Sequence, residues 1–326
     1  MAAHQISQRV VLCGAGFLGR NIVVSISKNN AAQNLLRRVQ ISSRHPERVH
    51  GSLKHIIPSE CLLPPVKVDV TKPEILAAAF EGADVVVSLV GILNGSREQF
   101  DEIQWRGAEN VAKAAKQNNA KVIHISAIGA DKTSSIPYEK TKALGEEAVF
   151  THCPDATIIR PSLIFGPGDE FFNRFATLSY FLPILPVFGN GKTRFQPVYV
   201  GDVAELVEIL TRKDNKIRER VAGKIIEAGG PEVFTFRQIM ELVLKYTGRT
   251  RPIVPVPWSA ATLQAMVLER LPHNVFTISQ SQVEQLKHDN VESSQYSPDR
   301  LPFAHFMEEY SHPLTSVHDV LPRYLK

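Results

Sequence analysis

Cysteine is scarce in this chain of 326 residues, which contains only Cys13, Cys61 and Cys153. The three lie far apart and show neither the paired spacing of a zinc site nor the density of a disulfide-rich domain. The sequence therefore argues against a disulfide framework and a cysteine-based metal centre. It predicts reduced thiols in an intracellular compartment.

A strong excess of one charge and a long apolar run are also missing. The formal net charge is +4, from 37 Lys and Arg against 33 Asp and Glu, which argues against a nucleic-acid partner. The most apolar stretch, residues 176–188, is shorter than a bilayer span and is interrupted by Pro183 and Pro186, so it predicts no transmembrane helix. Residues 1–9 are too short and polar for a secretory signal.

The chain does contain a glycine pattern near its start. An apolar strand at 10–12 leads into Gly14-x-Gly16-x-x-Gly19, and Phe17 and Leu18 begin a helical apolar pattern. Glycine at these positions permits a tight turn, close approach of a pyrophosphate and close packing of helix on strand, with the helix N-terminus facing the phosphates. We predict a dinucleotide-binding turn; the alternative is a glycine turn without a ligand.

The first half of the sequence alternates short apolar runs with amphipathic ones, the rhythm of an α/β doubly wound parallel sheet, or Rossmann fold. We predict this NAD(P)-binding domain over residues 1–166. The expected strands are 39–42, 66–68, 84–90, 121–126 and 156–160, and the expected helices are 73–80, 99–117 and 138–150.

Beyond Gly166 prolines and glycines loosen the rhythm, and we predict a smaller interwoven C-terminal substrate lobe over 167–326. At about 195–228 the chain is expected to return partly to the sheet, through a strand at 224–227. Thr235 and Gln238 have the spacing of a capping box that opens a helix to about Tyr246. Further helices are expected at 259–270 and 280–287, and the tail from Glu292 shows no clear pattern.

The end of the second predicted strand lacks the acid that NAD-preferring folds use for the ribose 2′-hydroxyl. It reads Ser42-Ser43-Arg44 instead, so Arg44 with the serines favours NADP(H) over NAD(H) by holding a 2′-phosphate, unless Arg44 is a solvated loop residue. Asp69, after the third strand, either faces the adenine or merely starts the turn before Thr71.

Tyr138 and Lys142 lie one helical turn apart, so the ammonium is expected to stabilise the phenolate and lower the pKa of Tyr138 for acid–base catalysis. Such a pair also arises by chance on exposed helices. Ser126 is expected at the carboxyl edge of the sheet, where its hydroxyl either polarises a carbonyl or caps a loop.

The stretch 160–169, with Pro161, leaves a strand at the same edge and is expected to line the cofactor or substrate site. The apolar residues that follow it fit a core better than a ligand wall, although a long apolar substrate would need such a lining. They are Phe171, Phe172, Phe175, Tyr180, Phe181, Ile184 and Leu185.

Together these residues resemble the short-chain dehydrogenase/reductase superfamily in its extended or atypical branch, over nearly the whole chain. The stretches 124–131, 159–169, 195–204 and 286–291 are similar to one subgroup. That subgroup contains the 39-kDa-type (ninth alpha-subcomplex) accessory subunit of mitochondrial complex I, bacterial relatives and a fungal coenzyme Q biosynthesis protein.

The resemblance implies a tightly held NADP(H) and a place at the matrix side of the mitochondrial inner membrane. It implies Tyr138 as proton donor, Lys142 as ribose ligand and Ser126 as their partner. The nucleotide would contact these residues: Gly14, Gly16, Phe17, Leu18, Gly19, Ser43, Arg44, Asp69, Val70, Val90, Gly91, Lys142 and Pro161.

Two departures from the family pattern weaken a claim of efficient catalysis. First, Leu12 and Cys13 stand where many extended members carry Thr-Gly, which leaves the exact phosphate contacts open. Second, the segment 89–91 reads Leu-Val-Gly in place of Asn-Ala-Gly, and Gln104 takes the place of an Asn common in active members.

Three functions follow from the sequence. The first is an NAD(P)H-binding accessory protein of the mitochondrial quinone or respiratory machinery, in complex I assembly or stability or in coenzyme Q biosynthesis, with an inner-membrane protein assembly as partner and peripheral membrane contact. The alternative is an active NAD(P)H-dependent oxidoreductase on a lipophilic carbonyl or quinone, using Tyr138 and Lys142. The third is a redox-sensing regulator that binds nucleotide without chemistry. A cytoplasmic location is the alternative to the mitochondrial one.

Overall fold

The computed structural model describes residues 7–33, 36–268, 279–295 and 297–325. The chain forms two compact units, and each is built from separate stretches of sequence. The first unit comprises 1–160, 200–227 and 296–302, and the second comprises 161–199, 228–295 and 303–326.

The first unit is built around an eight-stranded sheet of order β14-β11-β6-β5-β4-β1-β2-β3. Strands β1, β2, β3, β4, β5 and β6 pair in parallel, and β11 pairs in parallel with β14. The strands are β1 (Ser7–Cys13), β2 (Leu36–Ser43), β3 (Val66–Lys67), β4 (Val85–Ser88), β5 (Lys121–Ile125), β6 (Thr157–Pro161), β11 (Ile225–Ala228) and β14 (Arg300–Pro302).

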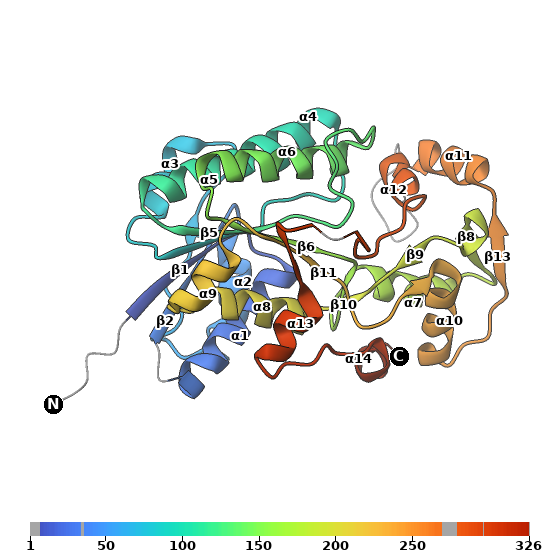
Figure 1. The fold of residues 1–326 in the computed structure, drawn as a ribbon. Coiled ribbons are helices and arrows are strands. Elements are labelled where there is room, and N and C mark those ends of the chain that lie inside the picture. The colour runs from blue at the N-terminus through green and yellow to red at the C-terminus, as the bar shows by residue number, and fades with distance from the viewer. Residues whose placement is uncertain (1–6, 34–35, 269–278, 296, 326) are drawn as a thin grey trace. The chain divides into compact units, whose positions relative to one another are not determined.

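Helices cover both faces of this sheet: α3, α5 and α6 lie on one face, and α1 packs with α8 on the other (Figure 1). Burial on both faces explains why β4 and β5 are buried at every position. The helices are α1 (Phe17–Gln33), α2 (Pro46–Leu53), α3 (Pro73–Ala79), α4 (Arg97–Gln99), the π-helix η1 (Phe100–Arg106), α5 (Gly107–Gln117), α6 (Pro137–His152), α8 (Val200–Thr211) and α9 (Asn215–Val221).

The predicted doubly wound parallel sheet is confirmed. The direction in which successive strands are added to the sheet reverses at β1, because β2 and β3 lie on one side of it and β4, β5 and β6 lie on the other. In such sheets a ligand binds at the carboxyl ends of the strands beside this switch point. The glycine turn leaves β1 at this place.

A buried ion pair joins β2 to α8. Arg37 is 1% exposed and Glu208 is fully buried, and their side chains are in direct contact. The Arg37 guanidinium also donates to Asn30 Oδ1 at 3.0 Å and to Thr211 Oγ1 at 3.3 Å. These bonds offset part of the cost of removing the two charges from water, although the Arg37 Nη2 atom has no hydrogen-bond partner among the described residues.

The second unit contains three two-stranded ladders and several helices. Strand β7 (Ile164–Phe165) pairs in parallel with β10 (Val198–Tyr199), β8 (Leu185–Phe188) pairs in parallel with β13 (Ile253–Val256), and β9 (Arg194–Phe195) pairs antiparallel with β12 (Phe234–Thr235). The helices are α7 (Phe171–Phe181), the 3₁₀-helix η2 (Gly189–Gly191), α10 (Phe236–Thr247), α11 (Trp258–Leu268), α12 (Gln280–Gln285), α13 (Phe303–Glu309) and α14 (Val317–Tyr324).

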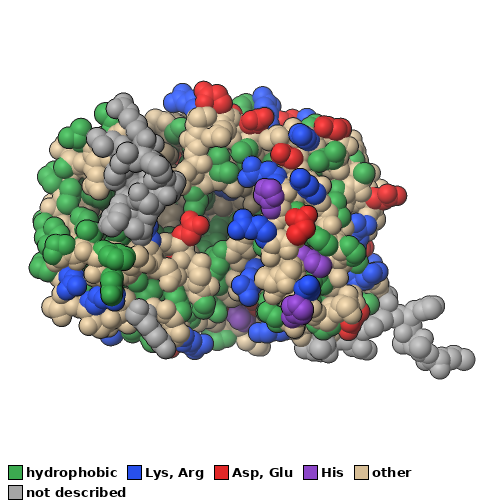
Figure 2. All heavy atoms as spheres, turned by 180° about the vertical axis from the view of Figure 1, so that it is seen from behind, with side chains coloured by type: hydrophobic (Ala, Val, Ile, Leu, Met, Phe, Trp, Pro, Cys, Tyr) green, Lys and Arg blue, Asp and Glu red, His purple; other side chains and the backbone are tan. Residues whose placement is uncertain are grey.

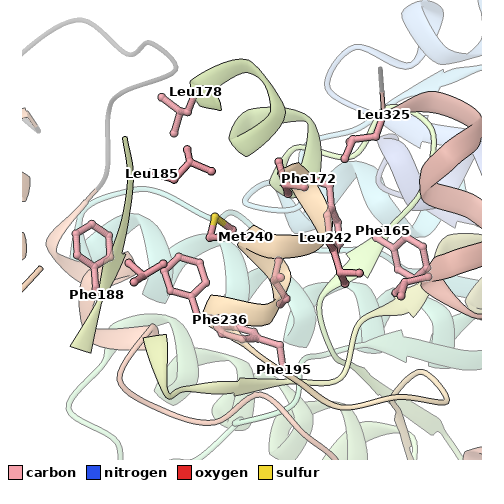
Figure 3. Close-up of a cluster of buried hydrophobic side chains, with 14 of the residues drawn as sticks. Phe165, Phe172, Leu178, Leu185, Phe188, Phe195, Phe236, Met240, Leu242 and Leu325 are labelled. Carbon is pink, nitrogen blue, oxygen red and sulfur yellow. The ribbon is translucent and has the colours of Figure 1, made fainter. Parts of the chain in front are cut away.

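Phenylalanines dominate the core of the second unit (Figure 3). Phe172 from α7, Phe188 from β8 and Phe236 from α10 point into one cluster with Phe165 and Phe195. Of the apolar residues expected at 171–185, Phe172 and Leu185 are buried, whereas Tyr180, Phe181 and Ile184 are exposed. The expectation of a core there is therefore correct for part of the stretch only.

The predicted capping box is confirmed. Thr235 accepts a hydrogen bond from the Gln238 N–H, Gln238 accepts one from the Thr235 N–H, and α10 ends at Gly248 in the left-handed conformation. The helix expected at 259–270 is α11, although residues 269 and 270 lie outside the described part. The tail beyond Glu292 contributes β14, α13 and α14, which its pattern did not predict.

None of the described helices combines the length and apolar character needed to cross a membrane. Cys13, Cys61 and Cys153 are buried and form no disulfide.

Candidate functional site

The glycine turn joins the end of β1 to the start of α1. The N–H of Gly14 donates to the Ser42 carbonyl at 2.8 Å, and the Leu89 N–H donates to the Cys13 carbonyl at 2.8 Å. These bonds fix the turn between β2 and β4. Helix α1 begins at Phe17, so its free N–H groups open at the switch point of the sheet.

The three glycines meet the three requirements of a dinucleotide-binding turn. Gly14 has a φ of 120°, and a Cβ there would lie 2.8 Å from Leu89 Cβ, so the tight turn requires glycine. A Cβ on Gly19 would lie 3.1 Å from Leu89 Cδ1, which shows close helix-to-strand packing. A Cβ on Gly16 would meet nothing within 4 Å, so the backbone there is open to an approaching phosphate. Phe17 and Leu18 form the first turn of α1 beside this opening.

Ser43, Arg44 and Asp69 lie together beyond the ends of β2 and β3. The Ser43 carbonyl accepts from the Val68 N–H at 2.9 Å, and Arg44 is exposed. Burial would raise the pKa of Asp69, but hydrogen bonds from the Thr71 backbone and hydroxyl, with the charges of Arg44 and Lys72, outweigh it and lower that pKa. The Asp69 Oδ1 atom thus accepts hydrogen bonds from Thr71 within its own turn. Arg44 provides a positive charge at the end of β2, where NAD-preferring folds carry an acid.

Val70 lies in the loop after β3, and Val90 and Gly91 lie in the loop after β4. A Cβ on Gly107, the first residue of α5, would approach Val70 Cγ2 to 2.7 Å and Val90 Cγ1 to 3.4 Å, so both valines close around this glycine. Gly91 lies beside Lys142, whose Nζ would be 3.0 Å from a Cβ at that position. Glycine therefore leaves room for the ammonium group.

Lys142 is buried on α6 and is held by main-chain carbonyls. Its Nζ donates to Val90 O at 3.0 Å and to Ile125 O at 3.1 Å, at the ends of β4 and β5. Tyr138, one turn earlier, packs its ring edge-on against Phe100 with centroids 6.3 Å apart. Thus α6 places the Lys142 side chain at the carboxyl edge of the sheet and packs the Tyr138 ring against η1.

The expected lowering of the Tyr138 pKa is wrong. Burial, with the nearby Glu139 carboxylate, raises the pKa of Tyr138 to about 12. Burial also lowers the pKa of Lys142 to about 8, against the opposing charge of Glu146. Helical spacing shows that two groups are close, but removal from water disfavours both the phenolate and the ammonium.

Two buried polar atoms near Lys142 have no hydrogen-bond partner among the described residues: Ser126 Oγ and His124 Nε2. Both residues come from the β5 end, where they share one face because they are two apart. His124 Nδ1 lies 3.0 Å from Ser88 Oγ, and burial, with the charge of Lys142, lowers the pKa of His124 to about 3. An unpaired hydroxyl at Ser126 is suited to bind a polar ligand atom.

Sequence reasoning placed Gln104 in a continuous helix, but the structure places it in the π-helical segment η1. Its Nε2 donates to Thr141 Oγ1 at 3.0 Å, and its Oε1 accepts from the Ile92 N–H at 3.3 Å. Gln104 therefore links the connection after β4 to α6. π-Helical turns are frequent at functional sites, but no residue spacing signalled this one.

The remaining predicted residue, Pro161, ends β6 and belongs to the second unit. The described residues contain no cluster of three or more His, Cys, Asp or Glu that could hold a metal ion. The candidate site therefore comprises the glycine turn, the ends of β2 and β3, Ser126 after β5, and Tyr138 and Lys142 on α6.

A parallel sheet with a glycine turn at its switch point defines a nucleotide-binding protein of the Rossmann class. Residues 10–229 match the family model described as the NAD dependent epimerase/dehydratase family. The chain belongs to this family. This confirms the resemblance to the extended short-chain dehydrogenase/reductase superfamily, and with it the class of cofactor, NAD(P).

The relatives of this chain include two respiratory subunits. The chain is 30% identical over 258 residues to the mitochondrial NADH dehydrogenase (ubiquinone) 1 alpha subcomplex subunit 9 of Arabidopsis thaliana, covering 78% of this chain and 61% of that protein. It is 28% identical over 250 residues to the mitochondrial NADH-ubiquinone oxidoreductase 40 kDa subunit of Neurospora crassa, covering 76% and 62%. A ceramide reductase of Caulobacter vibrioides is 30% identical over 197 residues, covering 60% and 58%.

The chain thus spans about three fifths of the length of the curated relatives it matches. Among solved structures, dTDP-glucose 4,6-dehydratase of Streptomyces venezuelae has a TM-score of 0.68 at 18% identity, covering 98% of this chain and 96% of that one. A nucleoside-diphosphate-sugar epimerase of Staphylococcus aureus has a TM-score of 0.69 at 17% identity, covering 98% and 99%. These likenesses concern the fold.

Proposed function

We propose that this protein is an NAD(P)H-binding accessory protein of mitochondrial quinone or respiratory machinery, at the matrix side of the inner membrane. The observation that carries the nucleotide part is the open backbone at Gly16, between the constrained glycines 14 and 19. The similarity to the two respiratory subunits supports the accessory role, in complex I assembly or stability or in coenzyme Q biosynthesis. A bound nucleotide stabilises the folded chain by mass action.

The nucleotide part is tested by three glycine substitutions, with NADPH affinity measured by calorimetry and stability by thermal melting. Gly16→Ala places a methyl group in the open approach, so we expect at least about tenfold weaker binding with an unchanged melting temperature. Gly14→Ala strains the turn and clashes with Leu89, so the apoprotein itself should lose about 1–3 kcal/mol. Gly51→Ala, where a Cβ also meets nothing, is the matched control for affinity. Unchanged NADPH affinity in Gly16→Ala would refute the assignment of the site.

The accessory role is tested by native mass spectrometry of the purified protein, followed by a quinone and ketone panel. We expect nucleotide to co-purify and to stay reduced throughout. Loss of the gene in its host should lower the amount of assembled complex I or of coenzyme Q. A host with normal levels of both would contradict the accessory role.

A second function, an NAD(P)H-dependent oxidoreductase on a lipophilic carbonyl, is favoured by the unpaired Ser126 hydroxyl, by Lys142 at the ends of β4 and β5 with Tyr138 one helical turn earlier on α6, and by the similarity to the Caulobacter ceramide reductase. The nicotinamide, when bound, would supply a hydride. The raised pKa keeps Tyr138 protonated at neutral pH, as a proton donor to the substrate oxygen must be. The unpaired Ser126 hydroxyl would donate a hydrogen bond to that oxygen, and Lys142 would hold the ribose.

Tyr138→Phe separates the two functions. For the oxidoreductase we expect wild-type nucleotide affinity and a loss of at least about 100-fold in the rate of nucleotide oxidation by an active panel member. Equal rates in wild type and Tyr138→Phe would remove Tyr138 from the chemistry. No rate in the wild type leaves the accessory role as the better account.

A further inference from the structure

The second unit exposes a cluster of large apolar side chains where α7 ends. Tyr180 is 62%, Phe181 63% and Ile184 40% exposed, all within five residues. The rings of Tyr180 and Phe181 lie edge to face with centroids 5.0 Å apart. Figure 2 shows one side of the molecule, on which hydrophobic side chains gather over the second unit with Lys and Arg beside them. Contiguous apolar surface of this kind marks an interaction site.

Two arginines flank this cluster. The Arg249 guanidinium lies 4.8 Å from the centre of the Tyr180 ring and donates to Ser179 Oγ at 3.3 Å. Arg251 donates through Nε to Leu182 O at 3.0 Å. The partners of both groups are neutral, and no described carboxylate neutralises either charge.

Close to the exposed rings, the segments that build this face carry basic residues without acids. Residues 171–188 and 242–257 are held together by the packing of α7 on α10 and by the pairing of β8 with β13. They contain Lys245, Arg249 and Arg251 and no Asp or Glu. They also contain Arg174, whose charge is offset by Glu170 at the start of α7, while Glu241 lies one turn before Lys245 on α10. The net charge of the whole chain is only +4, so this local concentration of basic residues favours an anionic partner at this face.

A hollow of about 240 Å³ lies beside the two exposed rings. Asn173, Thr177 and Arg249 line it together with the apolar Ala176 and Leu325. The boundary between lipid headgroups and acyl chains offers polar and apolar surroundings side by side. A surface that combines amide, hydroxyl and guanidinium groups with exposed aromatic rings is suited to bind there.

We propose that this face, defined by Tyr180, Phe181, Ile184, Arg249 and Arg251, docks on the surface of a phospholipid bilayer that contains anionic lipid. The aromatic and aliphatic side chains enter the headgroup boundary, and the arginines contact lipid phosphates. The face belongs wholly to the second unit and uses no residue of the nucleotide site. Docking is therefore independent of nucleotide binding and of any turnover.

The test is flotation of the full chain with vesicles of phosphatidylcholine alone or mixed with phosphatidylserine. We expect binding to the mixed vesicles that weakens as salt is added, because salt screens the lipid charge. Tyr180→Ser with Phe181→Ser should weaken binding at least about tenfold. Arg251→Gln should weaken it about fivefold.

Ile56→Ser is the matched control, because Ile56 is 59% exposed and belongs to the first unit, which contributes no residue to this face. It should bind vesicles like the wild type. NADPH affinity, measured on every variant, should stay at the wild-type value and shows that each variant is folded. Phe181→Trp gives an independent readout, since its fluorescence should shift to the blue on mixed vesicles.

Two results would overturn the proposal. One is the absence of wild-type binding to mixed vesicles. The other is equal binding by the wild type and the Tyr180, Phe181 double variant. Self-association that this double variant abolishes, without vesicle binding, would assign the face to a second copy of the chain instead.

Discussion

Burial decides the protonation of the polar residues under helix α6. Lys142 and His124 are both buried, and the pKa of each is lowered, to about 8 and about 3. His124 is therefore neutral at physiological pH, whereas Lys142 is close to its midpoint. The charge of Glu146 opposes the lowering of the Lys142 pKa, and two main-chain carbonyls accept hydrogen bonds from the ammonium.

The lowered pKa of Lys142 makes the free energy of unfolding depend on pH in the alkaline range. Its pKa is about 8 in the folded chain and 10.5 ordinarily, so between these values the unfolded chain binds more protons and the free energy of unfolding rises with pH. The difference in that free energy between wild type and Lys142→Met should grow by on the order of 3 kcal/mol over this range. Urea denaturation at several pH values measures it. Cys13, whose raised pKa acts in the opposite direction, cancels in the difference.

Arg44 tests the preference for NADP(H) over NAD(H). Because it is the cation at the end of β2 where an acid would select NAD, Arg44→Ala should weaken NADPH binding about tenfold and leave NADH binding unchanged. Calorimetry with both nucleotides measures this. Arg48→Ala, another exposed arginine one turn away on α2, is the matched control. Equal losses for both nucleotides would show that Arg44 does not read the 2′-phosphate.

At the scale of elements, two helical glycines have opposite surroundings. A Cβ on Gly145 in α6 would lie 2.9 Å from the Gln104 carbonyl of η1, whereas a Cβ on Gly51 in α2 would meet nothing within 4 Å. Gly145→Ala should therefore cost about 1–3 kcal/mol by separating α6 from η1. Gly51→Ala should gain about 0.5–1 kcal/mol from helix propensity. Chemical denaturation of both variants checks the signs; a stabilised Gly145→Ala would mean that α6 does not pack tightly there.

The sequence predicts an element well where one local pattern determines it. The glycine turn, the valine-rich β4 and the Thr235 capping box are such cases. It fails for β14, three residues whose strand character comes only from pairing with β11. Likewise, spacing located Tyr138 and Lys142, but their pKa values depend on burial by elements distant in sequence, which spacing does not encode.

At the scale of the whole molecule, the Arg37 and Glu208 pair joins the first stretch of the first unit to its second. Glu208→Gln removes the carboxylate that the buried Arg37 shares with Arg212 and should lower the free energy of unfolding by about 3–5 kcal/mol. Arg37→Met and Glu208→Leu, combined with Arg212→Met so that no partner of Glu208 keeps an unpaired charge, should recover most of this loss. Thermal and urea unfolding measure both. A triple variant as unstable as Glu208→Gln would mean that the pair supplies more than charge compensation.

The same pair has a consequence for how the chain is made. On the ribosome, β2 and its arginine emerge well before Glu208 exists, so the nascent first unit carries a cation that it cannot yet bury. The unit can close only after α8 has been synthesised, and its sheet acquires the last strand, β14, later still. During that interval the early strands expose open edges. The protein should therefore depend on chaperones more during its synthesis than after its release.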